Sequence, residues 1–166
     1  LPNIQITFCN DPATNRPLTY LNGKCVEKEI RTLAVSSKVS PIAALGFVRE
    51  ALVRQQQEMG KQKGIVMDGR DIGTNVLPNA ELKIFLTASA DVRAKRRYDE
   101  LTAKGTVCDY EVIKQDIIKR DHQDMTRATA PLKQAEDAVL VDSSDMTIDQ
   151  VVDAIIAEYH KISGAN

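Results

Sequence analysis

The sequence is poor in aromatic residues and in residues that bind soft metals. Its 166 residues include no tryptophan, two histidines and three cysteines, and aromatic residues make up 4% of the chain. The cysteines form no C-x-x-C pair, so neither a zinc site nor a disulfide framework is indicated. With a net charge of −1 and few rings on which bases could stack, the composition argues against a nucleic-acid-binding domain.

Long apolar runs are also missing. The longest is far shorter than the roughly 20 residues that a membrane-spanning helix needs, and no signal-peptide pattern opens the chain. We therefore expect a cytoplasmic protein with no membrane partner. The length fits one domain of ordinary size, or one domain with a small insertion.

Residues 1–63 predict a small antiparallel sheet followed by helices. Apolar and polar residues alternate in three strand-like stretches, 3–9, 18–21 and 24–28. Asn22-Gly23, between the last two, is typical of a type I′ hairpin turn. Such a sheet is marginal alone and should pack on other parts of the chain.

A helical pattern follows from Ile30. Pro41 and Gly46 interrupt this pattern, so we expect a bend or a break there. A second helix is expected over 47–59.

Residues 64–166 predict a parallel sheet, because apolar runs alternate with helical patterns. The expected strands are 65–67, 82–86 and 138–141. One helix is expected over 92–104, with Ser89 or Asp91 as its N-cap. Another is expected over 109–125, and Thr147 with Gln150 forms a capping box for the last helix.

The stretch DGRD directly follows the first of these strands. Ligands of open α/β sheets bind outside the carboxyl ends of the strands, so we expect a site here. Arg70 offers donors that match phosphate oxygens, Asp71 can accept from sugar hydroxyls, and Asp68 could support Mg²⁺ through water. The alternative is a solvated turn in which Arg70 pairs with Asp68 or Asp71.

Two further groups of charged residues fall at helical spacing. Arg93, Arg96 and Arg97 share one side of their helix and favour an anion, although salt bridges with Asp99 and Glu100 would explain them equally well. 

The second group is Arg120, Asp124 and Arg127. These residues project from one face if the helix persists. They form either an anion clamp with an embedded acceptor or a self-neutralised surface.

Taken together, DGRDIGT, LKIFLTAS, RAKRR and KRDHQDMTRATAPL resemble bacterial cytidylate kinase, which phosphorylates CMP and dCMP with ATP. The resemblance covers nearly the whole chain. It implies an α/β fold of the P-loop nucleoside-monophosphate-kinase type, with a parallel sheet, helices on both faces and a small antiparallel insertion. Residues 1–63 would be the insertion that binds the nucleoside monophosphate. Residues 64–166 would be the kinase core, with a short lid around 93–107.

The resemblance also implies roles for individual residues. The residues that match the family's cytosine contacts are Ser40, Arg49 and Asp124. Arg31 matches an arginine of the family's insertion. The residues that match the family's phosphate-binding arginines are Arg70, Arg120 and Arg127. Asp71 would bind the ribose hydroxyls, and Asp68 would support Mg²⁺. The lid that closes over ATP would contain Arg93, Arg96 and Arg97.

The sequence departs from this family in one respect. No G-x-x-x-x-G-K-[ST] motif occurs, although the family carries this phosphate-binding loop near its N-terminus. We therefore expect the 166 residues to correspond to the later three-quarters of such a kinase, to transfer phosphate poorly and to self-associate through open strand edges. The full-length enzyme is expected to be a monomer. The alternatives are a CMP-binding fragment without activity and a nucleic-acid-binding domain that uses the Arg93–Arg97 helix.

Overall fold

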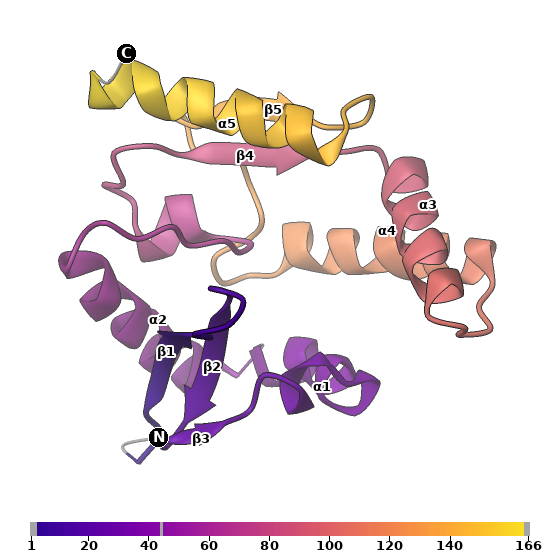
Figure 1. The fold of residues 1–166 in the computed structure, drawn as a ribbon, viewed down its shortest axis with the longest axis horizontal. Helices are drawn as coiled ribbons and strands as arrows, with labels where there is room; N and C mark the ends of the chain where they lie inside the picture. Colours follow the sequence, from indigo (N-terminus) through magenta and orange to yellow (C-terminus); the bar gives the residue numbers. More distant parts are fainter. Residues whose placement is uncertain (1–2, 44, 165–166) are drawn as a thin grey trace. The chain divides into compact units, whose positions relative to one another are not determined.

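The structure is a computed structural model that describes residues 3–43 and 45–164. Outside the described part lie residues 1–2, 44 and 165–166 and the side chains of Leu33, Ser36, Ser37 and Ser40. The chain forms two compact units, Leu1–Lys61 and Gln62–Asn166. Figure 1 labels the helices and strands of both.

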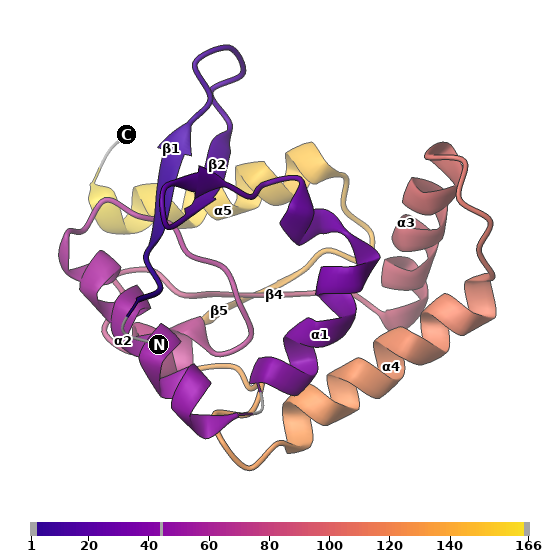
Figure 2. The same ribbon diagram turned by 90° about the horizontal axis from the view of Figure 1, so that it is seen from below.

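The first unit opens with a three-stranded antiparallel sheet in the order β1-β2-β3. Its strands are β1 (Ile6–Asn10), β2 (Pro17–Leu21) and β3 (Lys24–Cys25). Asn22 and Gly23 have φ angles of 50° and 81°, the left-handed values that a type I′ turn requires. The predicted hairpin is therefore confirmed. The loop between β1 and β2 extends well beyond the strands (Figure 2).

The helices of the first unit follow the sheet. A 3₁₀ turn, η1 (Glu29–Arg31), leads into α1 (Leu33–Ala43) and α2 (Gly46–Lys61). The predicted break is confirmed, but it falls after Ala43, since α1 continues through Pro41. On α2, the side-chain amide of Gln55 donates to the carbonyl of Ile4 at 3.3 Å and so joins this helix to the segment that enters β1.

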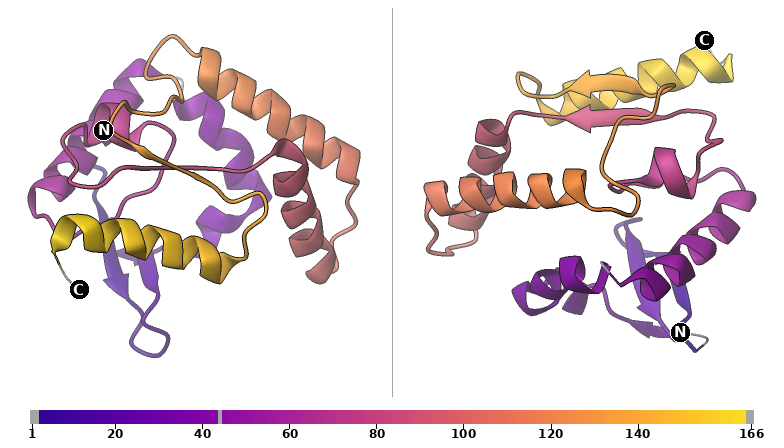
Figure 3. Two further views of the ribbon diagram at one scale, coloured as in Figure 1. Left: turned by 90° about the horizontal axis from the view of Figure 1, so that it is seen from above. Right: turned by 180° about the vertical axis from the view of Figure 1, so that it is seen from behind.

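The second unit contains a parallel pair of strands, β4 (Ile84–Thr87) and β5 (Val139–Asp142). Ile84 pairs with Val139 and Thr87 with Asp142. A parallel pair needs a long crossover, and here it contains α3 (Ala90–Ala103) and α4 (Tyr110–Thr126). The last helix, α5 (Ile148–Ser163), runs alongside the two strands (Figure 3). The expected α/β class is confirmed.

Local capping residues set the starts of these helices. The Ser89 hydroxyl accepts from the Val92 N–H at 3.2 Å, so Ser89 and not Asp91 caps α3. The Asp109 carboxylate caps α4 through the Val112 N–H at 3.0 Å. Thr147 and Gln150 form the predicted capping box of α5.

The expected strand over 65–67 is not formed. A strand is stabilised by hydrogen bonds to a neighbouring strand, and within the described residues the sheet of this unit contains β4 and β5 only. Val66 is fully exposed. An apolar run of three residues was therefore too weak a basis for this prediction. No helix in the described part is long and apolar enough to cross a lipid bilayer.

Candidate functional site

The residues that follow the run 65–67 form a tight turn that fixes Asp71. A single π-helical turn, η2 (Ile72–Val76), begins directly after Asp71. The carbonyl of Asp71 accepts from the N–H groups of Asn75 and Val76 at 2.9 and 3.2 Å. Its carboxylate accepts from the Asn75 side-chain amide at 3.0 Å. Asp71 is buried, with a relative exposure of 9%, so the turn holds its carboxylate in one place.

The carboxyl end of α4 supplies two further charged residues. Asp124 lies on the last turn of α4, and the helix ends at Thr126. Arg127 is already extended, with φ −61° and ψ 141°, and its Nε donates to the carbonyl of Ala130 at 2.7 Å. The condition that the helix persists through Arg127 is therefore not met. Arg127 still reaches Asp124, at 3.6 Å from its Nη1 to Oδ1.

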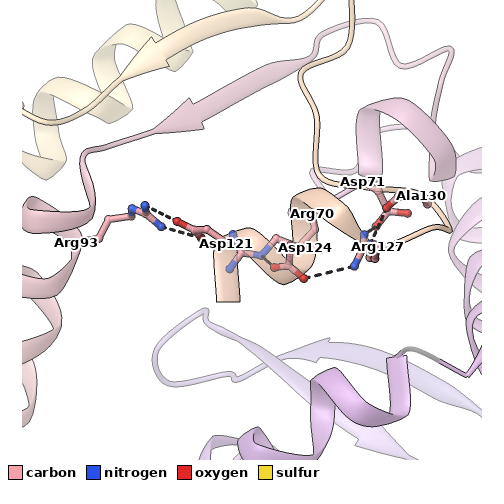
Figure 4. Close-up of polar contacts among 7 residues, drawn as sticks. All are labelled: Arg70, Asp71, Arg93, Asp121, Asp124, Arg127 and Ala130. Atoms are coloured by element: carbon pink, nitrogen blue, oxygen red, sulfur yellow. Dashed lines mark hydrogen bonds and ion pairs between the residues drawn. The ribbon is translucent and has the colours of Figure 1, made fainter. Parts of the chain in front are cut away.

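Four charged side chains meet at this place (Figure 4). We call them the charged cluster: Arg70, Asp71, Asp124 and Arg127. Arg70 Nε lies 3.1 Å from Asp124 Oδ2. On the other side, Arg127 Nη2 donates to Asp71 Oδ1 at 3.2 Å. The charges thus alternate along the cluster, and each guanidinium is held by a carboxylate.

Most side chains of the charged cluster are shielded from solvent. The side chains of Asp124 and Arg127 are 13% and 24% exposed, so solvent screens their interaction less than it screens a surface pair. Arg70 is the most open member, at 38%. An arginine held at one edge keeps further donors for an anion. The arrangement therefore suits binding of a phosphate group beside a carboxylate that accepts hydrogen bonds.

Two residues expected at this site, Asp68 and Arg120, are exposed. Among the described residues neither has an ion pair or a side-chain hydrogen bond. The same part of the chain holds no group of three or more metal-ligating side chains. A single open carboxylate such as Asp68 fits Mg²⁺ that is bound mainly by phosphate oxygens and water.

The three arginines of α3 are all paired within the protein. Arg93 binds Asp121 on α4. Arg96 donates to the carbonyls of Ser143 and Met146 at 2.6 and 3.2 Å, after the end of β5. Arg97 Nη1 lies 2.8 Å from Oε2 of Glu100 on the same helix. A salt bridge with Glu100 was one of the two alternatives that the sequence allowed. Their role toward ATP stays a prediction.

In the first unit, Arg31 donates to Glu27 through Nε and Nη2, at 2.9 and 2.7 Å. This contact is the main reason why the pKa of Glu27 lies below its ordinary value. Arg49 is partly buried on α2. The Ser40 side chain lies outside the described residues.

Sequence reasoning missed two side chains that support the second unit. Asp121 binds Arg93 across 28 positions. Lys83 is buried and binds Asp137 across 54 positions. No local sequence pattern predicts either pair, because each pair joins segments that meet only in the folded chain.

The fold is α/β, with a parallel pair of strands, helices and a small antiparallel sheet, which is consistent with a protein of the nucleoside-monophosphate-kinase type. Residues 3–161 match the family model described as cytidylate kinase. A cytidylate kinase of Bacteroides fragilis is 63% identical over 159 residues, which cover 96% of this chain and 69% of the relative. One from Parabacteroides distasonis is 57% identical over 163 residues, covering 98% and 71%. One from Caldicellulosiruptor bescii is 51% identical over 147 residues, covering 89% and 65%. The chain belongs to the cytidylate kinase family.

Proposed function

We propose that this chain carries the acceptor site of a cytidylate kinase, which transfers the γ-phosphoryl group of ATP to CMP or dCMP and yields CDP or dCDP. The observation that carries the proposal is the position of Asp124 between Arg70 and Arg127. A carboxylate between two arginines can accept from a base amino group while the arginines bind phosphate. The relatives are named cytidylate kinases, and this name indicates the same acceptor, a cytidine monophosphate. We place the enzyme in the cytoplasm, where CMP and ATP are present.

Asp124 is proposed to select cytosine. Cytosine presents an amino donor at N4, which a carboxylate can accept, whereas uracil presents a carbonyl oxygen at the same position. Two acceptors that face each other at a buried site cost on the order of 1 to 3 kcal/mol. Asp124 is 13% exposed, so this cost applies here. Arg49 and Ser40 stay predicted cytosine contacts, and Arg31 stays a predicted substrate contact.

The arginines of the second unit are proposed to bind the phosphates, with Asp71 on the ribose hydroxyls. Arg127 is preorganised, because Asp71 and the Ala130 carbonyl already fix its guanidinium. Arg70 and Arg120 are more open and would move onto the phosphates. Preorganised donors stabilise the charge that develops in phosphoryl transfer, and this reaction depends on positioning more than on covalent catalysis.

The chemical step is an in-line displacement. An oxygen of the CMP phosphate attacks the γ-phosphorus and forms the new P–O bond, while the bond from this phosphorus to the β–γ bridging oxygen breaks. The bridging oxygen keeps the electron pair and leaves with ADP. Arginines around the transferred group offset the negative charge. Mg²⁺, supported by Asp68 through water, would neutralise the β- and γ-phosphates when bound.

A second candidate is binding of CMP without efficient transfer. The 166 residues contain no G-x-x-x-x-G-K-[ST] motif, whose backbone amides and lysine hold the β- and γ-phosphates in P-loop kinases. We propose that this polypeptide by itself binds CMP, binds ATP weakly and transfers phosphate slowly. A coupled assay for ADP release, run with saturating CMP, separates the two candidates.

We also propose that this polypeptide associates with itself. Within the described residues the parallel sheet has two strands, so β4 and β5 each leave one edge unpaired. Leu86 and Leu140 on these strands are 52% and 56% exposed. We expect a dimeric or larger mass in light scattering at micromolar concentration. A monomeric mass would contradict this expectation.

Calorimetric titration with CMP, UMP and ATP at fixed salt tests the acceptor site. We expect CMP to bind more tightly than UMP, and Asp124→Ala to weaken CMP far more than UMP. Equal losses for both nucleotides would contradict base selection by Asp124. Absence of CMP binding to the unmodified chain would overturn the proposed site.

A further inference from the structure

Arg93 makes contacts that differ from those of its neighbours on α3. Each of its three nitrogens donates to an acceptor inside the protein. Nε binds the carbonyl of Ala88 at 3.0 Å, and Nη1 and Nη2 bind the two carboxylate oxygens of Asp121 at 3.1 and 2.6 Å. A bidentate arginine–carboxylate pair fixes direction as well as distance. Arg93 is thus held on two sides.

The two partners of Arg93 belong to different elements. Ala88 follows the last residue of β4 and is buried at 6% exposure. Asp121 lies on α4, one helical turn before Asp124. Arg93 therefore joins the carboxyl end of a core strand to the helix that carries part of the charged cluster. Figure 4 shows Asp121, which Arg93 contacts, and Asp124 of the charged cluster on the same helix.

A comparison with Lys95 on the same helix shows that the pair is more than a surface contact. Lys95 binds Asp99 within α3, and the two side chains are 64% and 55% exposed. Exposed pairs of this kind contribute little to stability. Arg93 and Asp121 are 34% and 20% exposed and lie 28 positions apart.

We propose that Arg93 is a positioning residue for Asp124, acting through Asp121, and not an ATP-binding residue of the lid. The inference rests on the proposed role of Asp124 in reading cytosine. By holding α4 against the end of β4, Arg93 sets where the carboxylate of Asp124 stands. Loss of the pair lets this segment of α4 move and so weakens selection of cytosine.

The test uses the 166-residue chain and four variants: Arg93→Met, Asp121→Asn, the double variant, and Lys95→Met as the control. Met keeps the apolar stem of Arg93, and Asn keeps the shape of Asp121. Hydrogen exchange of the amides of residues 121–127 measures mobility without any nucleotide. Calorimetry then measures the ratio of dissociation constants for CMP and UMP in each folded variant.

We expect faster exchange at residues 121–127 in both single variants and unchanged exchange in the control. The preference for CMP over UMP should fall by about tenfold in Arg93→Met, the equivalent of one charge-assisted hydrogen bond. Asp121→Asn should lower it in the same direction. The double variant should be no worse than the poorer single variant, because both changes remove one interaction.

Other results overturn the inference. Unchanged exchange at residues 121–127 in both single variants would show that the pair does not hold α4. If Arg93→Met weakened ATP binding but left the ratio of the CMP and UMP dissociation constants unchanged, Arg93 would be an ATP-binding residue of the lid. An unmodified chain that does not prefer CMP would overturn the proposed function, and this inference with it. The first two results leave that function intact.

Discussion

Arg127 and Asp71 lie 56 positions apart in the sequence, and Arg127 Nη2 donates to Asp71 Oδ1 at 3.2 Å. The contact ties the residue directly before η2 to the residue directly after α4. Because Arg127 also lies 3.6 Å from Asp124, it connects both carboxylates of the charged cluster. An arginine fixed in this way loses little conformational entropy when it binds a phosphate.

Replacement of Arg127 by Met tests this role. We expect CMP to bind at least about tenfold more weakly, since a charge-assisted phosphate contact is lost. Arg127→Lys should recover part of the affinity, because lysine keeps the charge but not the planar donors. Calorimetry provides the measurement. Lys119→Met, an exposed change on α4, is the control, and an equal loss there would show that the effect is general.

Replacement of Asp124 by Asn should change the base preference. The amide of Asn can donate to the carbonyl oxygen of uracil, whereas the carboxylate cannot. We expect the ratio of CMP to UMP affinity to fall by roughly tenfold or more, with UMP binding retained. Parallel titrations measure this ratio. A variant that kept the ratio of the unmodified chain would place the cytosine contact elsewhere.

The pair Lys83–Asp137 should make stability depend on acid pH. The hydrogen bond from Lys83, which binds both carboxylate oxygens at 2.8 and 2.6 Å, holds the pKa of Asp137 below its ordinary value. A carboxylate with a lowered pKa stabilises the fold above its unfolded pKa, and this contribution is lost as the pH falls through the folded value. Melting temperatures should therefore separate the unmodified chain from Asp137→Asn near neutral pH and converge in acid. A gap that stayed constant down to acid pH would contradict this account.

A side chain at Gly69 should destabilise the turn that carries Arg70. A Cβ atom at Gly69 would lie 2.9 Å from Cγ1 of Ile72, which is closer than such atoms approach in proteins. Gly69→Ala must therefore displace the Ile72 side chain, or the turn itself where that side chain cannot move, and we expect a loss of stability of roughly 1 kcal/mol. Chemical denaturation measures this cost. Gly46→Ala is the matched control, since a Cβ there meets no atom within 4 Å.

Two local signals in the sequence predicted the local structure correctly. Asn22-Gly23 adopts the hairpin turn, and Thr147 with Gln150 caps α5. In both cases the decisive interaction lies within a few residues, so the local sequence contains all of it. The run 65–67 failed as a strand because pairing depends on a partner that is distant in the chain.

The sequence by itself determined the family, the α/β class, most helix starts, and the set of residues from which the site is proposed. The tertiary structure decided how those residues are paired. Asp124 lies between Arg70 and Arg127, and Arg93 binds Asp121 instead of remaining open to an anion. Helix periodicity could not show this, because α4 ends before Arg127 and the partners come from separate elements. Capping and turn preferences act over a few residues, whereas ion pairs between elements form only when folding has brought those elements together.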